Sequence, residues 1–256
     1  MNYGRRFMRF FDAGPRAFGC LRYLHIQCVA LSINDMANVL EKCNKLLYLS
    51  LKMCDFGSES ALKMEHPQLT ILELSYWKCA SVQLICLPSL VQLTCEIWVQ
   101  PEAPKLAGPW LQNLQFLYLR RIHEECDLDW TLFFLQAAPL LKRMIVEILY
   151  RLSKVWDHTS CAHEEDEPKE FTELCQLLYQ KKGDSLTWDA PDDLKHYCLK
   201  ELIVNGYQIE EKFMRYTRRV VEAAVNLELL IGCKKYKLYI SCIRLFNWQF
   251  KECPVI

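Results

Sequence analysis

The fold is decided by the stretch LLYLSLKMC, residues 46–54, in which leucines occupy the first, fourth and sixth positions. Side chains two positions apart in a β-strand point to the same face of a sheet. Leu49 and Leu51 therefore share one face, and that face must be dry. The residues between and just after them are left on the opposite face. The stretch predicts a short strand that is buried on one side only.

The same spacing returns along the whole chain. Patterns of the form Leu-x-x-Leu-x-Leu, or a close apolar variant, begin at Leu21, Leu46, Leu69, Leu90, Leu114, Leu141, Leu199 and Leu227. Successive starts are 25, 23, 21, 24, 27, 58 and 28 residues apart, and all but the interval of 58 lie within the period of leucine-rich repeats, about 20–29 residues. The predicted fold class is α/β: a leucine-rich-repeat solenoid with parallel strands on the concave face and irregular helices or loops on the convex face.

The connections between the strands differ in kind. Asn34 is a candidate helix cap before DMANVLEKC, residues 35–43, where apolar side chains recur at helical spacing. DLDWTLFFLQAA, residues 127–138, predicts a second helix. Residues 72–90 and 93–114 have no clear helical period and contain several prolines, so they predict irregular or single-turn links.

Composition indicates a globular chain with no general electrostatic attraction to a partner. The 256 residues are 52% apolar and carry a net formal charge of zero, which gives no reason to expect nucleic acid or a membrane as a partner. No signal-peptide pattern opens the chain, and no run reaches the roughly 18 apolar residues of a membrane span. The 14 cysteines are therefore expected to be reduced and mostly buried, in a cytoplasmic or nuclear protein.

The repeat pattern divides the chain into four expected segments. Residues 1–19 form a basic arm that is expected to be disordered, and residues 20–150 hold the leucine-rich repeats. Residues 151–193 are an insertion, in which the acidic loop HEEDEPKE precedes a helix from about Phe171 to Gln180. Residues 194–256 form a tail of strand, long helix and strand that continues the solenoid.

The tail carries a family resemblance. In order it contains Leu202-Ile203-Val204, Gly206-Tyr207, Glu210-Glu211, a basic aromatic run from Phe213 to Arg219, and Ala224-Val225-Asn226-Leu227. This order resembles the FBD-like C-terminal module of plant F-box/leucine-rich-repeat proteins. The upstream segments LRYLHIQC, LLYLSLKMCDF and LTILELSYWKC are similar to the irregular repeats of the same proteins, especially those of grasses.

The resemblance implies a function in protein recognition. Proteins of this family dock on a Skp-type adaptor of a ubiquitin ligase through an N-terminal F-box and select the substrate with their repeats. Nothing in residues 1–20 matches the F-box signature, which puts binding to a Skp-type adaptor in doubt. The resemblance therefore implies the substrate-recognition region of a plant F-box ubiquitin-ligase subunit, apparently lacking the F-box, with an unknown protein substrate as its partner.

The strand register names the side chains that a concave face would offer to a partner. The candidate partner-binding residues are Tyr23, His25, Tyr48, Lys52, Glu73, Tyr118, Arg120 and Arg143. Tyrosine and arginine are enriched in interface hot spots, so Tyr23, Tyr48, Tyr118 and Arg120 are the expected anchors. The alternative is that most of these residues contribute nothing to binding, because every solenoid has outward-facing strand residues. A register slip of one residue would also exchange the two faces.

No catalytic residue, metal site or cofactor is predicted. His158, Cys161 and His163 are metal-capable, but structural zinc normally needs four ligands, and the sequence has no Cys-x-x-Cys pair. No local signature supports a cysteine nucleophile, so the chain is not expected to be an enzyme.

Two basic clusters offer a further alternative. Arg5, Arg6 and Arg9 lie among aromatic residues, and Arg215, Arg218 and Arg219 cluster in the tail; either group would attract phosphate. The tail arginines follow an acidic helix start, an arrangement that the helix dipole already favours. No nucleic-acid partner is predicted from them. The other functional alternative is a truncated or structural relic with no independent activity, whose apolar end is uncapped before Leu21.

Overall fold

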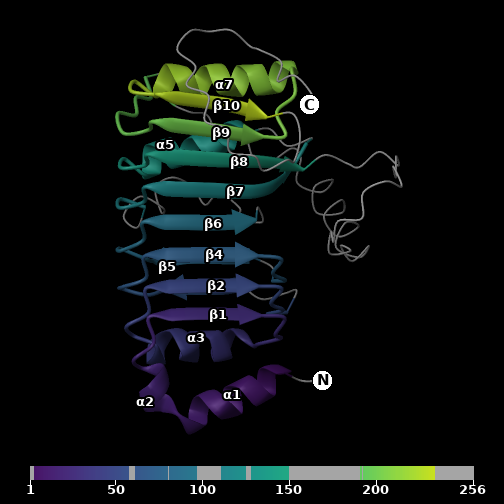
Figure 1. Ribbon diagram of the computed structural model, residues 1–256, viewed down its shortest axis with the longest axis vertical. Coiled ribbons are helices and arrows are strands. Elements are labelled where there is room, and N and C mark those ends of the chain that lie inside the picture. The colour runs from purple at the N-terminus through teal and green to yellow at the C-terminus, as the bar shows by residue number, and fades with distance from the viewer. Residues whose placement is uncertain are drawn as a thin grey trace, which may run out of the picture.

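The computed structural model describes residues 3–57, 61–79, 81–96, 111–124, 128–149, 191 and 193–233. Within them the chain is α/β, and its main element is an eight-stranded sheet whose neighbouring strands are all parallel. The strands follow one another in chain order (Figure 1): β1 (Tyr23–Gln27), β2 (Tyr48–Lys52), β4 (Ile71–Ser75), β6 (Gln92–Glu96), β7 (Phe116–His123), β8 (Arg143–Leu149), β9 (Glu201–Asn205) and β10 (Leu229–Cys233). The predicted α/β class with parallel strands is confirmed.

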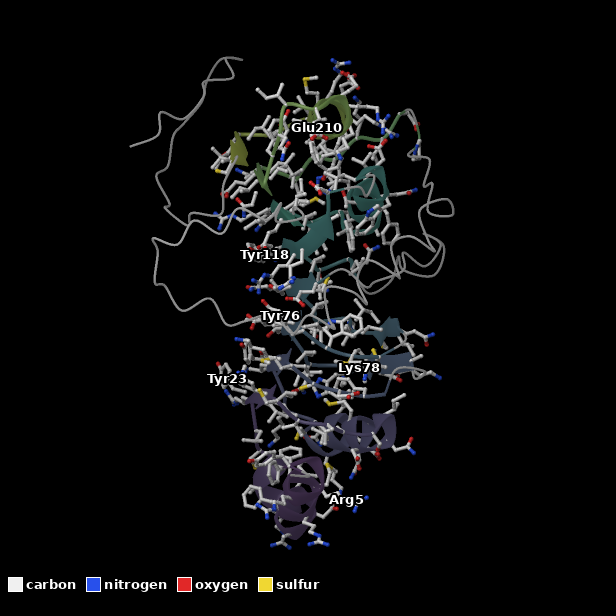
Figure 2. The ribbon with its side chains drawn as sticks, turned by 90° about the vertical axis from the view of Figure 1, so that its right-hand side faces the viewer. Arg5, Tyr23, Tyr76, Lys78, Tyr118 and Glu210 are labelled. Atoms are coloured by element: carbon white, nitrogen blue, oxygen red, sulfur yellow. The ribbon has the colours of Figure 1, made fainter. Side chains whose placement is uncertain are left out.

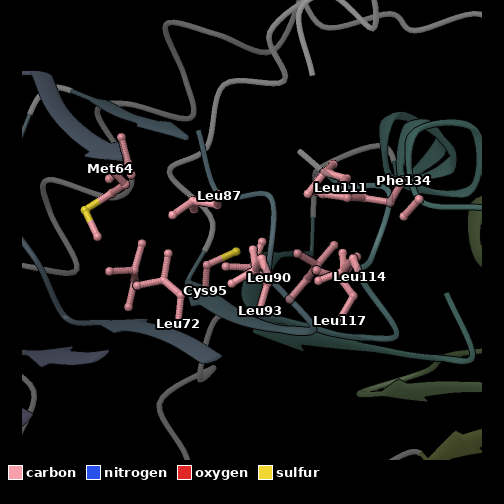
Figure 3. Close-up of a cluster of buried hydrophobic side chains, with 14 of the residues drawn as sticks. Met64, Leu72, Leu87, Leu90, Leu93, Cys95, Leu111, Leu114, Leu117 and Phe134 are labelled. Atoms are coloured by element: carbon pink, nitrogen blue, oxygen red, sulfur yellow. The ribbon is translucent and has the colours of Figure 1, made fainter. Parts of the chain in front are cut away.

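The strand register confirms which side of each strand is dry. Leu49 pairs with Leu24 on one side and with Leu72 on the other. Leu49 and Leu72 are 0% exposed. Figure 3 shows Leu72, Leu93 and Leu117 of the sheet gathered with buried side chains of the layer behind it. Burying aligned leucines in one continuous cluster is what fixes the register, because a slip by one residue would expose all of them.

A second layer covers this inner face of the sheet, and it opens with α3 (Ile33–Lys42). Ser32 caps the helix: its hydroxyl accepts a hydrogen bond from Asp35 N at 3.1 Å, and the Asp35 carboxylate accepts one from Ser32 N at 3.0 Å. The predicted cap, Asn34, is wrong and lies inside the helix. The reciprocal pair at Ser32 satisfies two amide donors at once, which Asn34 could not do from within the first turn.

The next part of the layer is a second sheet that the sequence pattern does not reveal. β3 (Ala61–Glu65) and β5 (Ser81–Cys86) form a two-stranded parallel sheet. The prediction of an irregular link over residues 72–90 is therefore wrong where β5 lies. Val82 of β5 and Leu62 of β3 are buried. The run SVQLIC is too short to show a clear period, and its pairing with β3 decides its conformation.

The layer ends with a short helical segment that packs against the helix of the tail. The helix predicted over residues 127–138 is a 3-10 turn, η1 (Asp129–Leu132), followed by the short α5 (Phe133–Ala137). The tail helix α7 (Glu211–Ala223) contacts it through Thr131, whose hydroxyl donates to the hydroxyl of Tyr216 at 2.9 Å. Arg219 Nη1 also donates to Asp129 Oδ2 at 2.5 Å. These contacts join residues that are 85 and 90 positions apart in sequence.

The N-terminal residues are helical, so the disordered arm expected over residues 1–19 is wrong. α1 (Tyr3–Ala13) and α2 (Pro15–Phe18) lie at the end of the molecule beyond α3 (Figure 1). Phe11 is 0% exposed, and its ring centroid lies 4.5 Å from that of Phe18. Gly4 lies so close to the rest of the fold that a Cβ there would be 1.7 Å from the Ala30 carbonyl oxygen. The apolar end before Leu21 is therefore covered, because the aromatic side chains of the arm bury themselves against it.

The tail continues the main sheet with the same repeat geometry. Its first strand begins at Glu201 and not at Leu194, and it pairs with β8 on one side and with β10 on the other. Residues at the eighth position of five repeats have positive φ: Cys28 (55°), Met53 (53°), Tyr76 (51°), Arg121 (59°) and Gly206 (81°). Glycine adopts this conformation without the steric cost that other residues incur. Gly206 of the tail thus takes the position that has positive φ in four earlier repeats.

Two buried histidines hold successive repeats together in the same way. His66 and His196 each stand three residues before the first leucine of a repeat, and they are 1% and 2% exposed. Nε2 of each ring lies 3.0 Å from a carbonyl oxygen of the preceding repeat, that of Cys43 and that of Ala138. Nδ1 of His196 accepts a hydrogen bond from Leu199 N at 2.9 Å, and Nδ1 of His66 accepts one at 3.2 Å. With Nδ1 accepting, Nε2 is left to donate to the carbonyl oxygen, so each ring bridges its own repeat and the preceding one.

Several expectations fall on residues outside the described part of the chain. The insertion expected over residues 151–193, with its acidic loop and helix, is described only at 191 and 193. Residues 97–110, part of a link expected to be irregular, and residues 234–256 of the tail also lie outside the described part of the chain.

Candidate functional site

The candidate site is the face of the eight-stranded sheet that points away from β3, β5 and the helices behind them, called here the outer face. Parallel register places its side chains in rows that cross the sheet. One row runs Tyr23, Tyr48, Ile71, Gln92, Phe116, Arg143, Glu201 and Leu229, and the next runs His25, Ser50, Glu73, Thr94, Tyr118, Ile145, Ile203 and Ile231. Figure 2 shows Tyr23, Tyr76 and Tyr118 along one side of the molecule.

The β1–β2 end of the outer face is open. Tyr23 is 70% exposed, and its ring centroid lies 6.2 Å from that of Tyr48 with 40° between the ring planes. His25 is exposed, and its Nε2 lies 3.3 Å from Gln27 Oε1. The end therefore offers an aromatic pair and an imidazole to solvent.

Tyr48 links this open end to β4. Its hydroxyl donates a hydrogen bond to Glu73 Oε2 at 2.8 Å. Partial burial, followed by this bond to a carboxylate, raises the pKa of the Tyr48 phenol. The phenol therefore keeps its proton at neutral pH and holds the Glu73 carboxylate in place.

The β7–β8 centre of the outer face is closed on itself. The Tyr118 hydroxyl donates a short hydrogen bond to Glu147, whose residue is only 8% exposed. Arg120 Nε lies 3.6 Å from the same carboxylate, and the guanidinium lies 5.6 Å from the centroid of the Tyr118 ring. Burial and the adjacent carboxylate raise the pKa of the Tyr118 phenol. Tyr118, Arg120 and Glu147 therefore contact one another within the chain.

Glu96 belongs to the same centre and is almost completely buried. The residue is 1% exposed, and its Oε2 accepts a hydrogen bond from Tyr76 N at 2.6 Å. Burial raises the pKa of Glu96, against the opposing effect of that bond and of the nearby arginines. Arg121 Nη1 donates to the Tyr76 hydroxyl at 2.9 Å, with the guanidinium 4.9 Å from the ring centroid.

A third polar group lies between β8 and β9. Arg143 donates to Glu201 through two nitrogens, Nε at 2.5 Å and Nη2 at 2.9 Å. The bidentate geometry and the pairing of the two residues in register make this a fixed ion pair. Arg143 is therefore already engaged by the neighbouring strand.

The structure places all eight candidate residues on the outer face but divides them. Five of them lie toward the β1–β2 end, on β1, β2 and the adjacent β4: Tyr23, His25, Tyr48, Lys52 and Glu73. Tyr118 and Arg120 lie at the centre, and Arg143 lies beyond them.

Sequence reasoning missed two residues of the outer face, and the strand register alone does not reveal that two others are buried. Tyr76 and Arg121 stand at the eighth repeat position, where positive φ turns the chain, and they contact each other on the outer face. The recurrence of the eighth position from repeat to repeat is the signal that could have found them. Glu96 and Glu147 are outward in register but buried, because aromatic and arginine side chains of neighbouring strands cover them.

No metal or membrane feature is found in the described part of the chain. Its described residues contain no group of three or more His, Cys, Asp or Glu side chains that could hold a metal ion. His158, Cys161 and His163 lie outside those residues. Among the helices that the structure describes, none is both long enough and apolar enough to span a bilayer.

Comparisons with protein-family models, with curated proteins and with solved structures found no match to this chain.

Proposed function

We propose that the chain is a protein–protein interaction module, a leucine-rich-repeat solenoid whose outer face is the concave, partner-binding surface. It resembles the substrate-recognition region of a plant F-box ubiquitin-ligase subunit without the adaptor-docking motif. The partner is a protein of the cytoplasm or nucleus, and neither enzymatic activity nor a cofactor is part of the proposal.

The observation that carries the proposal is the exposed aromatic pair at the β1–β2 end of the eight-stranded parallel sheet. Tyr23 holds a large ring in solvent at 70% exposure while Tyr48 supports it from the next strand. Rigid aromatic side chains on a fixed scaffold lose little conformational entropy on binding and are enriched in hot spots. A surface several strands wide is also large enough for an interface of about 1,200–2,000 Å².

The N-terminal cover of the sheet supports an independent module over a relic. Repeat arrays need a cover at each end, because a terminal repeat otherwise exposes its apolar face. α1 and α2 supply this at the N-terminal end, with Met8, Phe11 and Phe18 buried there. Asp12 of α1 also pairs with Lys42 of α3 at 3.0 Å. The uncapped end that motivated the relic alternative is therefore not present.

The proposal is tested by pull-down from plant extract with matched variants. Tyr23→Ala combined with His25→Ala removes exposed side chains from the outer face. Lys63→Ala combined with Glu65→Ala removes two exposed side chains from β3, on the second sheet. A protein identified by mass spectrometry should be retained by the wild type and by the β3 variant but lost with the outer-face variant. Equal retention by all three would refute the outer face as the binding surface.

A further inference from the structure

Glu73 differs from the other carboxylates of the outer face in its partners. Glu147 has Arg120 at 3.6 Å, and Glu201 has Arg143 in a bidentate pair. Glu96 is buried and lies in the field of Arg120 and Arg121. Within the described residues Glu73 has no ion pair at all, and its one hydrogen bond comes from the Tyr48 hydroxyl. It is half-buried, so its charge is neither fully solvated nor neutralised.

The surroundings of Glu73 leave room for a cation. Its register neighbours across the sheet are Ser50 and Thr94, both short side chains. Tyr48 fixes Oε2 of the carboxylate and leaves Oε1 without a hydrogen-bond partner among the described residues. The Tyr48 ring and the exposed Tyr23 ring continue the surface toward the edge of the sheet. A carboxylate next to two aromatic rings attracts a cation both electrostatically and through the ring faces.

We propose that this group, Tyr23, Tyr48 and Glu73, is a subsite for an arginine side chain of the protein partner. This inference rests on the proposed function, which it deepens by naming what the partner presents. The guanidinium forms a charge-assisted hydrogen bond with Glu73 Oε1 and stacks on the tyrosine rings.

Arginine fits this subsite better than lysine. The planar guanidinium can stack on an aromatic ring and donate to a carboxylate at the same time, whereas the lysine ammonium is a strongly hydrated point charge. The same pairing already occurs within this chain, where Arg120 lies over the Tyr118 ring and pairs with Glu147. The partner's arginine would complete at Glu73 the arrangement that Arg120 completes at Glu147.

The test uses the full chain and three synthetic peptides of Gly and Ser that differ only at a central arginine, lysine or citrulline. Citrulline keeps the shape of arginine but has no charge. Binding is followed by NMR of ring-labelled tyrosine in the wild type, in Glu73→Gln and in the control Glu65→Gln. Glu65 is an exposed carboxylate on β3, so its variant makes the same charge change away from the subsite. Glu73→Gln retains an acceptor for Tyr48 and is expected to fold, which its melting curve checks.

The expected result is saturable shifts of the Tyr23 and Tyr48 rings with the arginine peptide. Citrulline, and separately Glu73→Gln, should weaken binding about 10-fold, as the loss of a charge-assisted hydrogen bond predicts, while lysine binds less tightly than arginine. Glu65→Gln should change binding less than about 2-fold, since exposed distant charges are screened. Absent ring shifts, or equal affinity of the arginine and citrulline peptides, would overturn the subsite.

The proposed function has a separate outcome. If the pull-down partner is lost with the Tyr23 and His25 variant but fully retained by Glu73→Gln, the outer face binds a protein and the arginine subsite is wrong.

Discussion

The β1–β2 end and the β7–β8 centre of the outer face carry similar side chains, yet their environments are opposite. At the end, Tyr23 is 70% exposed and Glu73 has no ion pair among the described residues. At the centre, Tyr118, Arg120 and Glu147 bind one another, and Glu147 is 8% exposed. Residue type and register are therefore not enough to identify an interface anchor. What matters is whether a neighbouring strand already supplies the complementary group.

This difference changes which of the expected anchor residues should contribute to binding. Tyr118 and Arg120 would have to break their contacts with Glu147 before contacting a partner, and that would leave a buried carboxylate unpaired. Tyr23 is exposed, so on binding it would give up only its contact with water. We expect binding energy at the end of the face and structural stabilisation at its centre.

The largest expected effect tests the register on which the comparison depends. Leu72→Ala should lower the free energy of unfolding by about 2–5 kcal/mol, because Leu72 is 0% exposed between the sheet and the layer behind it. Ile71→Ala, one residue earlier on the outer face, is the control and should cost less. Chemical denaturation measures both. A larger loss for Ile71→Ala than for Leu72→Ala would show that the faces are exchanged.

Gly4→Ala should weaken the N-terminal cover and so affect the β1–β2 end of the outer face but not its centre. A Cβ at Gly4 would meet the Ala30 carbonyl oxygen at 1.7 Å, so α1 must shift. Forcing an atom into such a site costs about 1–3 kcal/mol. Hydrogen exchange should speed up in α1 and β1 but not in β7 and β8. Gly14→Ala is the control, since a Cβ there would meet its nearest atom at 4.0 Å. Unchanged exchange in α1 would contradict the close packing at Gly4.

Tyr118→Phe and Tyr23→Phe remove the same hydroxyl from the two regions. At the centre the loss leaves the Glu147 carboxylate without its phenol donor and should cost about 1–3 kcal/mol. At the end Tyr23 is exposed, and the loss should stay within about 0.5 kcal/mol. Thermal or chemical unfolding of the pair is the measurement. Similar small losses would mean that the centre is as open as the end.

Stability should fall as the pH is lowered below about 6.5, the ordinary pKa of histidine, in part because of His196. Burial lowers the pKa of His196, so the unfolded chain takes up a proton there more readily than the folded one. The contribution is complete above the unfolded pKa and is lost as the pH falls toward the folded pKa. His196→Gln should flatten this dependence in denaturation curves at several pH values. An identical slope for His196→Gln would exclude this ring as a source.

The smallest expected effect is a gain in stability from Glu96→Gln. Burial raises the pKa of Glu96, so its ionised form is disfavoured in the fold, and its unfavourable contribution grows as the pH rises through the folded pKa. Glutamine is neutral and can still accept the hydrogen bond from Tyr76 N. The melting temperature at neutral pH should rise for Glu96→Gln and stay unchanged for Glu65→Gln, whose carboxylate is exposed. A fall for Glu96→Gln would show that the nearby arginines outweigh the burial of this carboxylate.

The outcomes at particular residues show how far sequence patterns reach. The burial of Leu49 and Leu72 and the parallel pairing of their strands follow from a period of two within a repeat, which sterics alone impose. The N-terminal helices, by contrast, are stabilised by burial of Phe11 and Phe18 against the array, and no local pattern announces that contact. β5 depends in the same way on β3, a strand distant in sequence.

The sequence by itself determined the strands of the eight-stranded sheet, their dry faces and the rows of side chains on the outer face. Those features depend on intervals of two residues and of one repeat, and both can be counted along the chain. Only the tertiary structure decided which of those side chains remain available. Tyr118 meets Glu147 from the next strand, whereas Tyr23 lies on the first strand of the described sheet, near Tyr48, and is 70% exposed. Burial and pairing are set by neighbours in space, and spacing along the chain does not record them.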